Sequence, residues 1–144
     1  MSTAQSRGPI VIDTDVFSAD LIPGSQLAER YAAIIVGRSA FISFQTVAEI
    51  LYGALYRGWG QSRLGALESR LARVEIVHTG PQLVQVHAKL RAACRRVGHP
   101  LAQREHNADR WIAATALRLG VPLVSNDAIF HHVPGLTLES ARGG

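Results

Sequence analysis

Four acidic residues lie at or near the start of a helical pattern, and they are Asp13, Glu49, Asp109 and Asp127. Asp13 and Asp127 directly follow apolar runs, Glu49 lies one turn into the helix after a third, and Asp109 opens the helix that precedes the run at 123–125. In an open α/β sheet the carboxyl ends of the strands share one edge, and ligands bind in the crevice there. Carboxylates that meet at such an edge repel one another unless a cation lies between them. The spacing therefore predicts a divalent-metal site with carboxylate ligands.

Histidine and cysteine do not extend this pattern. The six histidines are scattered along the chain, and none has the His-x-x-x-His spacing of a zinc helix. Cys94 is the single cysteine, and its place in an apolar helical pattern predicts a core position. Oxygen ligands without nitrogen or sulfur favour Mg²⁺, with Mn²⁺ as a substitute, over Zn²⁺.

Each acid also has an ordinary structural interpretation. Asp13 and Asp127 both follow apolar runs and could cap the helices that come next. Thr46 and Glu49 have the spacing of a capping box, in which the Glu side chain reaches back to the cap N–H. Asp109 is preceded by an asparagine two residues earlier, which could serve as the cap in its place.

Short apolar runs alternate with helical periods, which predicts βα units and an α/β fold rather than a helical bundle. We expect strands at residues 10–12, 40–43, 74–77, 123–125 and 136–139. We expect helices at residues 16–21, 25–36, 45–57, 61–72, 81–97 and 107–119. Residues 98–106 show little periodicity, so they are predicted to form a loop just ahead of Asp109.

The bulk composition is that of a folded domain. A chain of 144 residues that is 47% hydrophobic can bury a sizeable core, and 18% charged residues are too few for a disordered chain. No apolar run approaches the roughly 20 residues that a membrane helix needs. We therefore expect a cytoplasmic protein without a membrane segment, with a flexible tail at 1–9 and a single domain at 10–140.

The charge balance favours a polyanionic partner. Lys and Arg number 15 against 11 Asp and Glu, for a net charge of +4. An acidic pocket on a basic body suits a nucleic acid that must meet a metal ion, although an arginine-rich genome would produce the same balance. Arg104 and Arg110 flank Asp109 in sequence and are the predicted RNA contacts, because the arginine fork grips phosphate oxygens in pairs.

Four segments carry a resemblance to a known family: 13–16 (Asp-Thr-Asp-Val), 43–51, 109–116 and 123–127. Taken in order, they resemble the PIN-domain ribonucleases, and specifically the VapC-type toxins of bacterial toxin–antitoxin pairs. The resemblance implies a Rossmann-like α/β/α sandwich with a mostly parallel sheet. It also implies a metal-dependent endoribonuclease and a VapB-type antitoxin that blocks the site. Two departures are Asp15, where the family often has Asn, and Ile129, where an acid often stands.

The resulting hypothesis is a toxin that hydrolyses RNA with a metal-activated water. The four acids would hold one or two Mg²⁺ ions, and the residues beside them would orient ligands or water, namely Thr14, Asp15, Ser125 and Asn126. Apolar and aromatic residues in the predicted hairpin 45–72, including Tyr52, Tyr56 and Trp59, could serve a homodimer contact or an antitoxin groove.

Two other functions fit parts of the sequence. The run from Ile10 to Asp15 resembles the Asp-x-Asp motif of haloacid-dehalogenase-type phosphatases, with Asp13 as nucleophile. That chemistry also needs a suitably placed lysine, whereas the only lysine, Lys89, lies in mid-helix, and Glu49 would have no role. The second alternative is a non-catalytic PIN-like module that binds RNA or a partner without cutting it.

Overall fold

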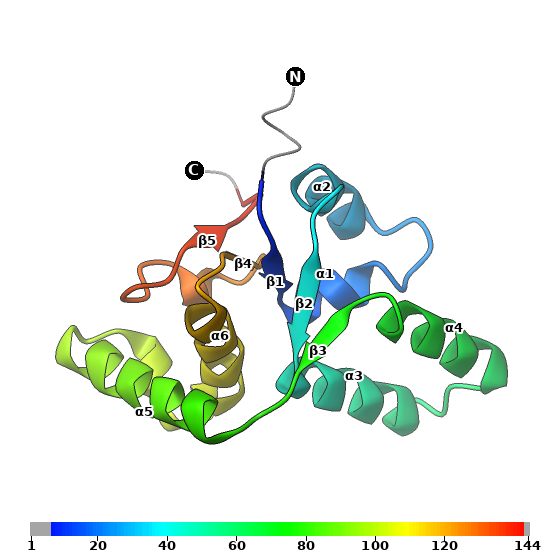
Figure 1. Cartoon of the computed structure of the whole chain (residues 1–144). Helices are drawn as coiled ribbons and strands as arrows, with labels where there is room; N and C mark the ends of the chain where they lie inside the picture. Colours follow the sequence, from blue (N-terminus) through cyan, green and yellow to red (C-terminus); the bar gives the residue numbers. More distant parts are fainter. Residues whose placement is uncertain (1–6, 143–144) are drawn as a thin grey trace.

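The computed structural model describes residues 7–142 (Figure 1). Within these residues, five strands form one sheet in the order β3-β2-β1-β4-β5, and every neighbouring pair is parallel. The strands are β1 (Ile10–Ile12), β2 (Ala40–Ser43), β3 (Glu75–Val77), β4 (Leu123–Val124) and β5 (Leu138–Glu139). The predicted α/β fold with a parallel sheet is confirmed, and its strands lie within about two residues of the predicted ranges.

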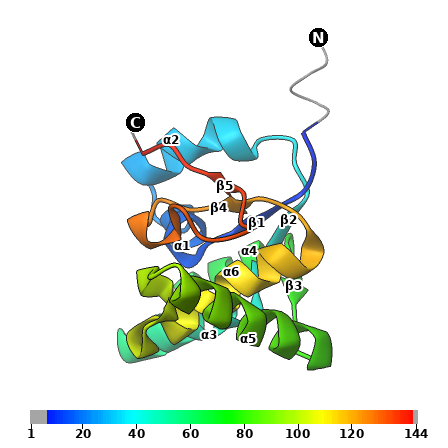
Figure 2. The same ribbon diagram turned by 90° about the vertical axis from the view of Figure 1, so that its left-hand side faces the viewer.

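Helices cover both faces of this sheet (Figures 1 and 2). They are α1 (Thr14–Ala19), α2 (Gln26–Ile35), α3 (Phe44–Tyr56), α4 (Gln61–Leu71), α5 (Pro81–Arg96) and α6 (Asn107–Leu119). Side chains of β1 alternate between two cores, as the two-residue period of a strand requires. Val11 packs with Leu83 and Ile112 on the α5–α6 side, whereas Ile10 and Ile12 belong to the core under α1 to α4.

The segment before α6 is more ordered than its sequence predicts. Residues 98–106, expected to be a loop, contain two short 3-10 helices, η2 (Pro100–Ala102) and η3 (Arg104–His106). Pro100 suits a first helical position, and His99 Nδ1 accepts a hydrogen bond from the Leu101 N–H at 3.0 Å. Leu101 is fully buried, so this segment is held against the core below it.

The ends of the described chain pack on α2 and the residues that follow it. Residues 1–6 of the expected tail lie outside the described residues. Arg7 donates a hydrogen bond to the Ala33 carbonyl at 3.0 Å, and the Gly8 carbonyl accepts one from Arg38 Nε at 2.8 Å. Within residues 7–142, no helix combines the length and the apolar character that crossing a membrane requires.

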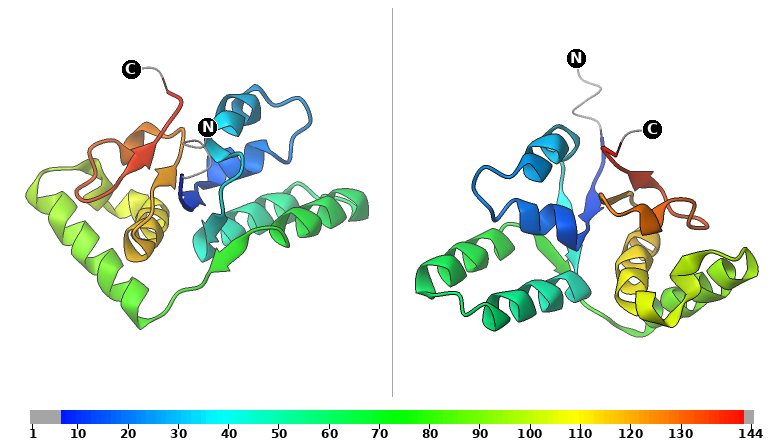
Figure 3. Two further views of the ribbon diagram at one scale, coloured as in Figure 1. Left: turned by 45° about the horizontal axis from the view of Figure 1, so that its top comes forward. Right: turned by 180° about the vertical axis from the view of Figure 1, so that it is seen from behind.

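Parallel strands bring their carboxyl ends to one edge of the sheet, where the predicted site residues lie. Helices α1 and α3 begin directly after β1 and β2, and α6 packs against both α3 and β1 (Figure 3). Ile12 is paired with Val124, so the residues that follow β1 and β4 leave the sheet side by side. The fold thus gathers segments that are distant in sequence around one crevice.

Candidate metal centre

Asp13 is the buried acid of the site. It follows β1, is 5% exposed and caps α1, because Oδ1 accepts a hydrogen bond from the Thr14 N–H at 2.7 Å. Its Oδ2 accepts a second hydrogen bond from Ser125 Oγ at 2.6 Å. Burial, followed by repulsion from Asp15, raises the pKa of Asp13 well above its ordinary value. Asp13 is therefore a helix cap whose charge is also costly to bury.

Asp15 and Asp127 lie beside Asp13 at the end of β4. Asp15 Oδ1 accepts a hydrogen bond from the Val16 N–H at 2.7 Å, and Oδ2 accepts one from the Asn126 N–H at 3.2 Å. Burial raises the pKa of Asp15, and the charge of Asp127 raises it further. Asp127 is exposed and caps the short 3-10 helix η4 (Ala128–Phe130), as its cap interpretation predicted.

Glu49 does not form the predicted capping box with Thr46. Ser43 is the cap of α3, so Thr46 and Glu49 lie inside the helix, and Thr46 is fully buried. Glu49 Oε1 instead accepts a hydrogen bond from Thr14 Oγ1 at 2.7 Å, and the two threonine hydroxyls are 2.9 Å apart. Burial raises the pKa of Glu49, and the charge of Asp109 adds to the effect.

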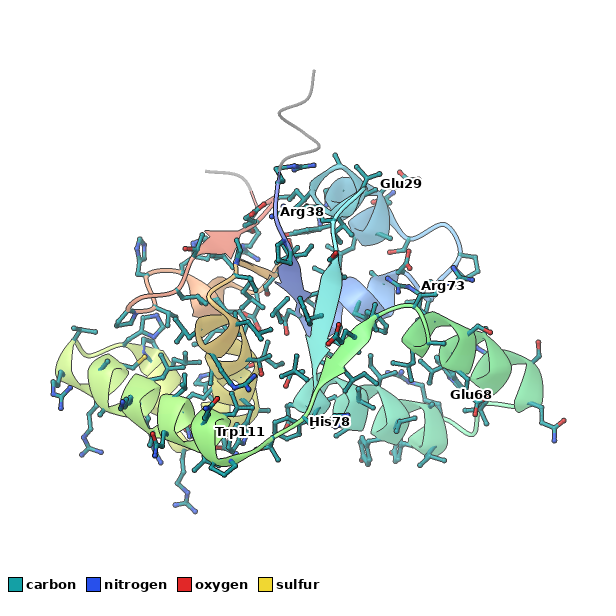
Figure 4. All side chains as sticks on the ribbon, viewed as in Figure 1. Glu29, Arg38, Glu68, Arg73, His78 and Trp111 are labelled. Atoms are coloured by element: carbon teal, nitrogen blue, oxygen red, sulfur yellow. The ribbon has the colours of Figure 1, made fainter. Side chains whose placement is uncertain are left out.

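Asp109 lies in the first turn of α6 and caps nothing. The cap position belongs to His106, without a side-chain cap hydrogen bond, and His106 Nδ1 lies 3.0 Å from Asp109 Oδ2. The ring of Trp111, labelled in Figure 4, makes an edge-to-face contact with Phe44 at 5.4 Å between centroids. This contact holds the start of α6 against the start of α3, which brings Asp109 near Glu49.

The acids therefore form two neighbouring groups that Thr14 joins. Its N–H binds Asp13, in the group with Asp15 and Asp127, and its hydroxyl binds Glu49, which interacts with Asp109. Within residues 7–142, no three His, Cys, Asp or Glu side chains are arranged closely enough to hold a metal ion without moving. The donor set nevertheless fits a hard cation, because burial makes the charges of Asp13, Asp15 and Glu49 costly and carboxylate oxygens are the ligands such a cation prefers.

Comparison with known proteins identifies the family. The model of the PIN domain matches residues 10–136. The chain belongs to the PIN-domain family. PIN-domain ribonucleases generally depend on a divalent metal ion, which agrees with the carboxylate donor set found here.

Within the PIN-domain family, several similar proteins carry the names VapC and VapBC. A Haemophilus influenzae protein named Ribonuclease VapC1 is 27% identical over 101 residues, which cover 70% of this chain and 72% of the relative. The structure of VapBC2 from Rickettsia felis bound to a promoter DNA fragment has a TM-score of 0.75 at 21% identity, covering 92% of this chain and 98% of that one.

A VapBC-5 structure from Mycobacterium tuberculosis has a TM-score of 0.64 at 27% identity, covering 92% of this chain and 96% of that one. The resemblance to PIN-domain proteins of the VapC type, drawn from the sequence, is confirmed. The haloacid-dehalogenase alternative finds no support in these comparisons.

One predicted RNA contact of this PIN domain is contradicted by its burial. Arg110 is 1% exposed, and its guanidinium donates hydrogen bonds to the carbonyls of Leu101 and Gln103 and to Asn107 Oδ1. Arg110 therefore binds the segment before α6 and offers no surface to a phosphate. Arg104 is exposed on η3 and has no ion-pair partner within residues 7–142, so it remains a candidate contact.

Sequence reasoning did not assign to the site three residues that support it, and it gave one of them, Thr46, the role of a helix cap. Thr46 and His106 contact Thr14 and Asp109, and Tyr31 binds the loop that carries Ser125. His106 could have been found, because a residue three positions before Asp109 lies on the same side of the helix start. The contact of Tyr31 joins residues 94 positions apart and leaves no local signal in the sequence.

Proposed function

We propose that this chain is a metal-dependent endoribonuclease, the VapC-type toxin of a VapBC toxin–antitoxin pair. The observation that carries the proposal is the bridge from Asp13 through Thr14 to Glu49, between carboxylates whose pKa values are both raised by burial. Carboxylates held together at such a cost are expected to be ligands of a cation. The relatives named Ribonuclease VapC1 supply the reaction, which is cleavage of RNA.

In this mechanism Asp13, Glu49, Asp109 and Asp127 hold Mg²⁺, with Mn²⁺ as a substitute. An ion held there would supply an activated water and would offset the charge that develops on the leaving oxygen of the phosphodiester. Glu49, Asp109 and Asp127 each keep one carboxylate oxygen without a hydrogen-bond partner among the described residues. Those oxygens are free to bind a metal, and Asp13, whose two oxygens each accept one hydrogen bond, would use a remaining lone pair. No protein nucleophile is required.

The neighbouring side chains set the direction of each carboxylate. Ser125 Oγ donates to Asp13 Oδ2, and the Asn126 N–H holds Asp15 in place. Thr14 fixes Asp13 and Glu49 together, so the two cannot turn away independently. Such supporting hydrogen bonds orient metal ligands and raise their affinity for the ion.

The antitoxin is proposed to occupy a groove that reaches Glu49. A cavity of about 760 Å³ has Thr14 and Glu49 in its lining at the site. Farther away it is lined by Tyr56 of α3, Trp59 of the connection and Arg63 of α4. An amphipathic segment could bury its apolar side chains there, while its end covers the acids. Arg63 stacks on Trp59 at 4.1 Å, so the groove also carries a cation for an acidic side chain of the partner.

Cleavage of RNA by the purified protein tests this function. Asp13→Asn and Asp109→Asn should abolish Mg²⁺-dependent cleavage, and EDTA should abolish it in the wild type. Glu29→Gln, a change of the same size at an exposed position on α2, should leave cleavage unchanged. Wild-type cleavage rates in Asp13→Asn at saturating Mg²⁺ would reject the metal site. Binding of RNA without any cleavage would instead favour the non-catalytic module.

A further inference from the structure

We propose that Tyr31 is a positioning residue that holds the site loop, residues 125–127, against the C-terminal segment, residues 138–142. The inference rests on the proposed function, because the site loop carries Asp127 and supports Asp13 and Asp15. Tyr31 lies in the middle of α2, far from these acids in sequence. Figure 2 shows α2 beside β5 and the end of the described chain.

The hydroxyl of Tyr31 is the centre of a buried network. The residue is 0% exposed, and its hydroxyl oxygen lies 3.0 Å from the Ser125 carbonyl oxygen and 2.9 Å from Asn126 Oδ1. The Ala141 N–H donates to the same oxygen at 3.0 Å, and Ser140 Oγ lies 3.2 Å from it. One hydroxyl group thus joins a helix, the site loop and the C-terminal segment.

Ser125 and Asn126, the two site-loop residues that Tyr31 contacts, each also donate a hydrogen bond to an aspartate of the site. Ser125 Oγ donates to Asp13 Oδ2 at 2.6 Å, and the Asn126 N–H donates to Asp15 Oδ2 at 3.2 Å. The Asn126 carbonyl also accepts a hydrogen bond from Arg142 at 3.1 Å. A shift of the loop away from Tyr31 would therefore move the hydrogen-bond donors of Asp13 and Asp15 together.

A second, separate contact already anchors the C-terminal segment. Arg38, labelled in Figure 4, makes two hydrogen bonds to the Glu139 carboxylate, at 2.8 and 2.9 Å, and its side chain is 3% exposed. β5 also pairs with β4 in the sheet. The segment would thus remain in place without the Tyr31 hydroxyl, whose distinct contribution is the position of the site loop.

Tyr31→Phe tests the hydroxyl alone, because the ring that packs in the core under α1 to α4 is retained. The expected result is that the Mg²⁺ concentration for half-maximal RNA cleavage rises about 10-fold, the usual effect of losing a residue that orients metal ligands. Mn²⁺ binding by calorimetry should weaken to a similar extent. Asn126→Ala removes the partner amide without touching the core and should give the same shift.

Glu139→Gln is the matched control, because it weakens the other anchor of the same segment. It should lower the melting temperature and leave the Mg²⁺ dependence of cleavage unchanged. Hydrogen exchange in metal-free protein should quicken at residues 125–127 in Tyr31→Phe, but not in Glu139→Gln. If the wild type is active and Tyr31→Phe has the same Mg²⁺ dependence and the same hydrogen exchange at residues 125–127, the inference is overturned. A wild type that neither binds metal nor cleaves RNA would overturn the proposed function instead, and loop exchange would still test Tyr31.

Discussion

Thr14 Oγ1 lies 2.7 Å from Glu49 Oε1, although the two residues are 35 positions apart and belong to different helices. The backbone N–H of the same threonine binds Asp13 Oδ1. Thr14 thereby links the end of β1 to α3 through two carboxylates. A residue of this kind would fix the separation of the two proposed metal ligands before any metal arrives, which would reduce the cost of binding the ion.

Replacing Thr14 by Val should therefore impair RNA cleavage while leaving the backbone hydrogen bond to Asp13. The variant keeps the shape of threonine but loses the hydroxyl, so Glu49 is free to turn away from Asp13. We expect a loss of cleavage activity of about 10- to 100-fold, the usual effect at such positions. In single-turnover cleavage the loss should appear mainly as a higher Mg²⁺ concentration needed for half-maximal rate. Thr14→Ser keeps the hydroxyl and should retain most of the activity; equal losses in both variants would contradict the role of that hydroxyl.

The strands and helices could be predicted because their signals are local. The apolar run Ile10–Ile12 ends at an acid, and Gly120 in the left-handed conformation ends α6, as its sequence context indicates. The capping box at Thr46 and Glu49 was wrong because Ser43, three residues earlier, takes the cap position. Two nearby candidates for one cap are hard to rank from sequence, since tertiary packing decides between them.

Arg110 shows a different limit of sequence reasoning. It was chosen as an RNA contact because it follows Asp109, but consecutive residues on a helix point about 100° apart. Asp109 faces the site, whereas Arg110 faces the buried carbonyls of Leu101 and Gln103. An arginine that directly follows a site acid on a helix therefore does not point toward the site.

Arg104 and Arg110 should consequently respond in opposite ways to loss of charge. Arg104→Gln should weaken RNA binding several-fold and reduce the salt dependence of binding by about one ion, because an exposed cation contributes to phosphate contacts. Arg110→Gln should lower the free energy of unfolding by about 2–3 kcal/mol, because two carbonyl oxygens lose their charged donor. Fluorescence anisotropy at several salt concentrations and urea unfolding measure the two effects.

A contrary result for either arginine would be informative. Unchanged RNA affinity and salt dependence in Arg104→Gln would remove that residue from the interface. An Arg110→Gln variant as stable as the wild type, but deficient in RNA binding, would mean that the segment before α6 opens in solution and exposes the arginine.

The contact between Arg38 and Glu139 predicts how stability depends on pH. The hydrogen bonds that Arg38 donates lower the pKa of Glu139 below its usual range, and the positive charge of Arg38 lowers it further. The folded state thus favours the carboxylate, and the resulting stabilisation is complete above the ordinary glutamate pKa of about 4.3. It is lost as the pH falls through the lowered pKa of the folded state.

Glu139→Gln should therefore melt a few degrees below the wild type at pH 7, and the difference should shrink as the pH falls below about 4.3 and vanish below the lowered pKa of Glu139. A contribution of about 1 kcal/mol is expected, because Glu139 remains partly exposed to water. Scanning calorimetry in EDTA gives the comparison, with Glu29→Gln as the control for an exposed acid that has no ion-pair partner in the described part of the chain. A difference in melting temperature that is the same at pH 3.5 and pH 7 would exclude the ion pair as its source.

The outer face of α3 supplies the last prediction, which concerns the antitoxin. Tyr52, Leu55 and Tyr56 are 68%, 74% and 79% exposed, and the two tyrosine rings stack at 5.9 Å between centroids. Exposed aromatic side chains that lie beside a groove are typical anchors of a protein interface. Both tyrosines also line the cavity that leads to Glu49.

Tyr56→Glu should weaken binding of the VapB-type antitoxin by about 100-fold, since it places a charge where an apolar anchor must be buried. RNA cleavage by the free protein should be unchanged, because Tyr56 is exposed and lies about two helical turns along α3 from Glu49. The antitoxin should then fail to inhibit the variant at concentrations that silence the wild type. Full inhibition of Tyr56→Glu would exclude this groove, and a loss of self-association in the same variant would assign the face to a homodimer instead.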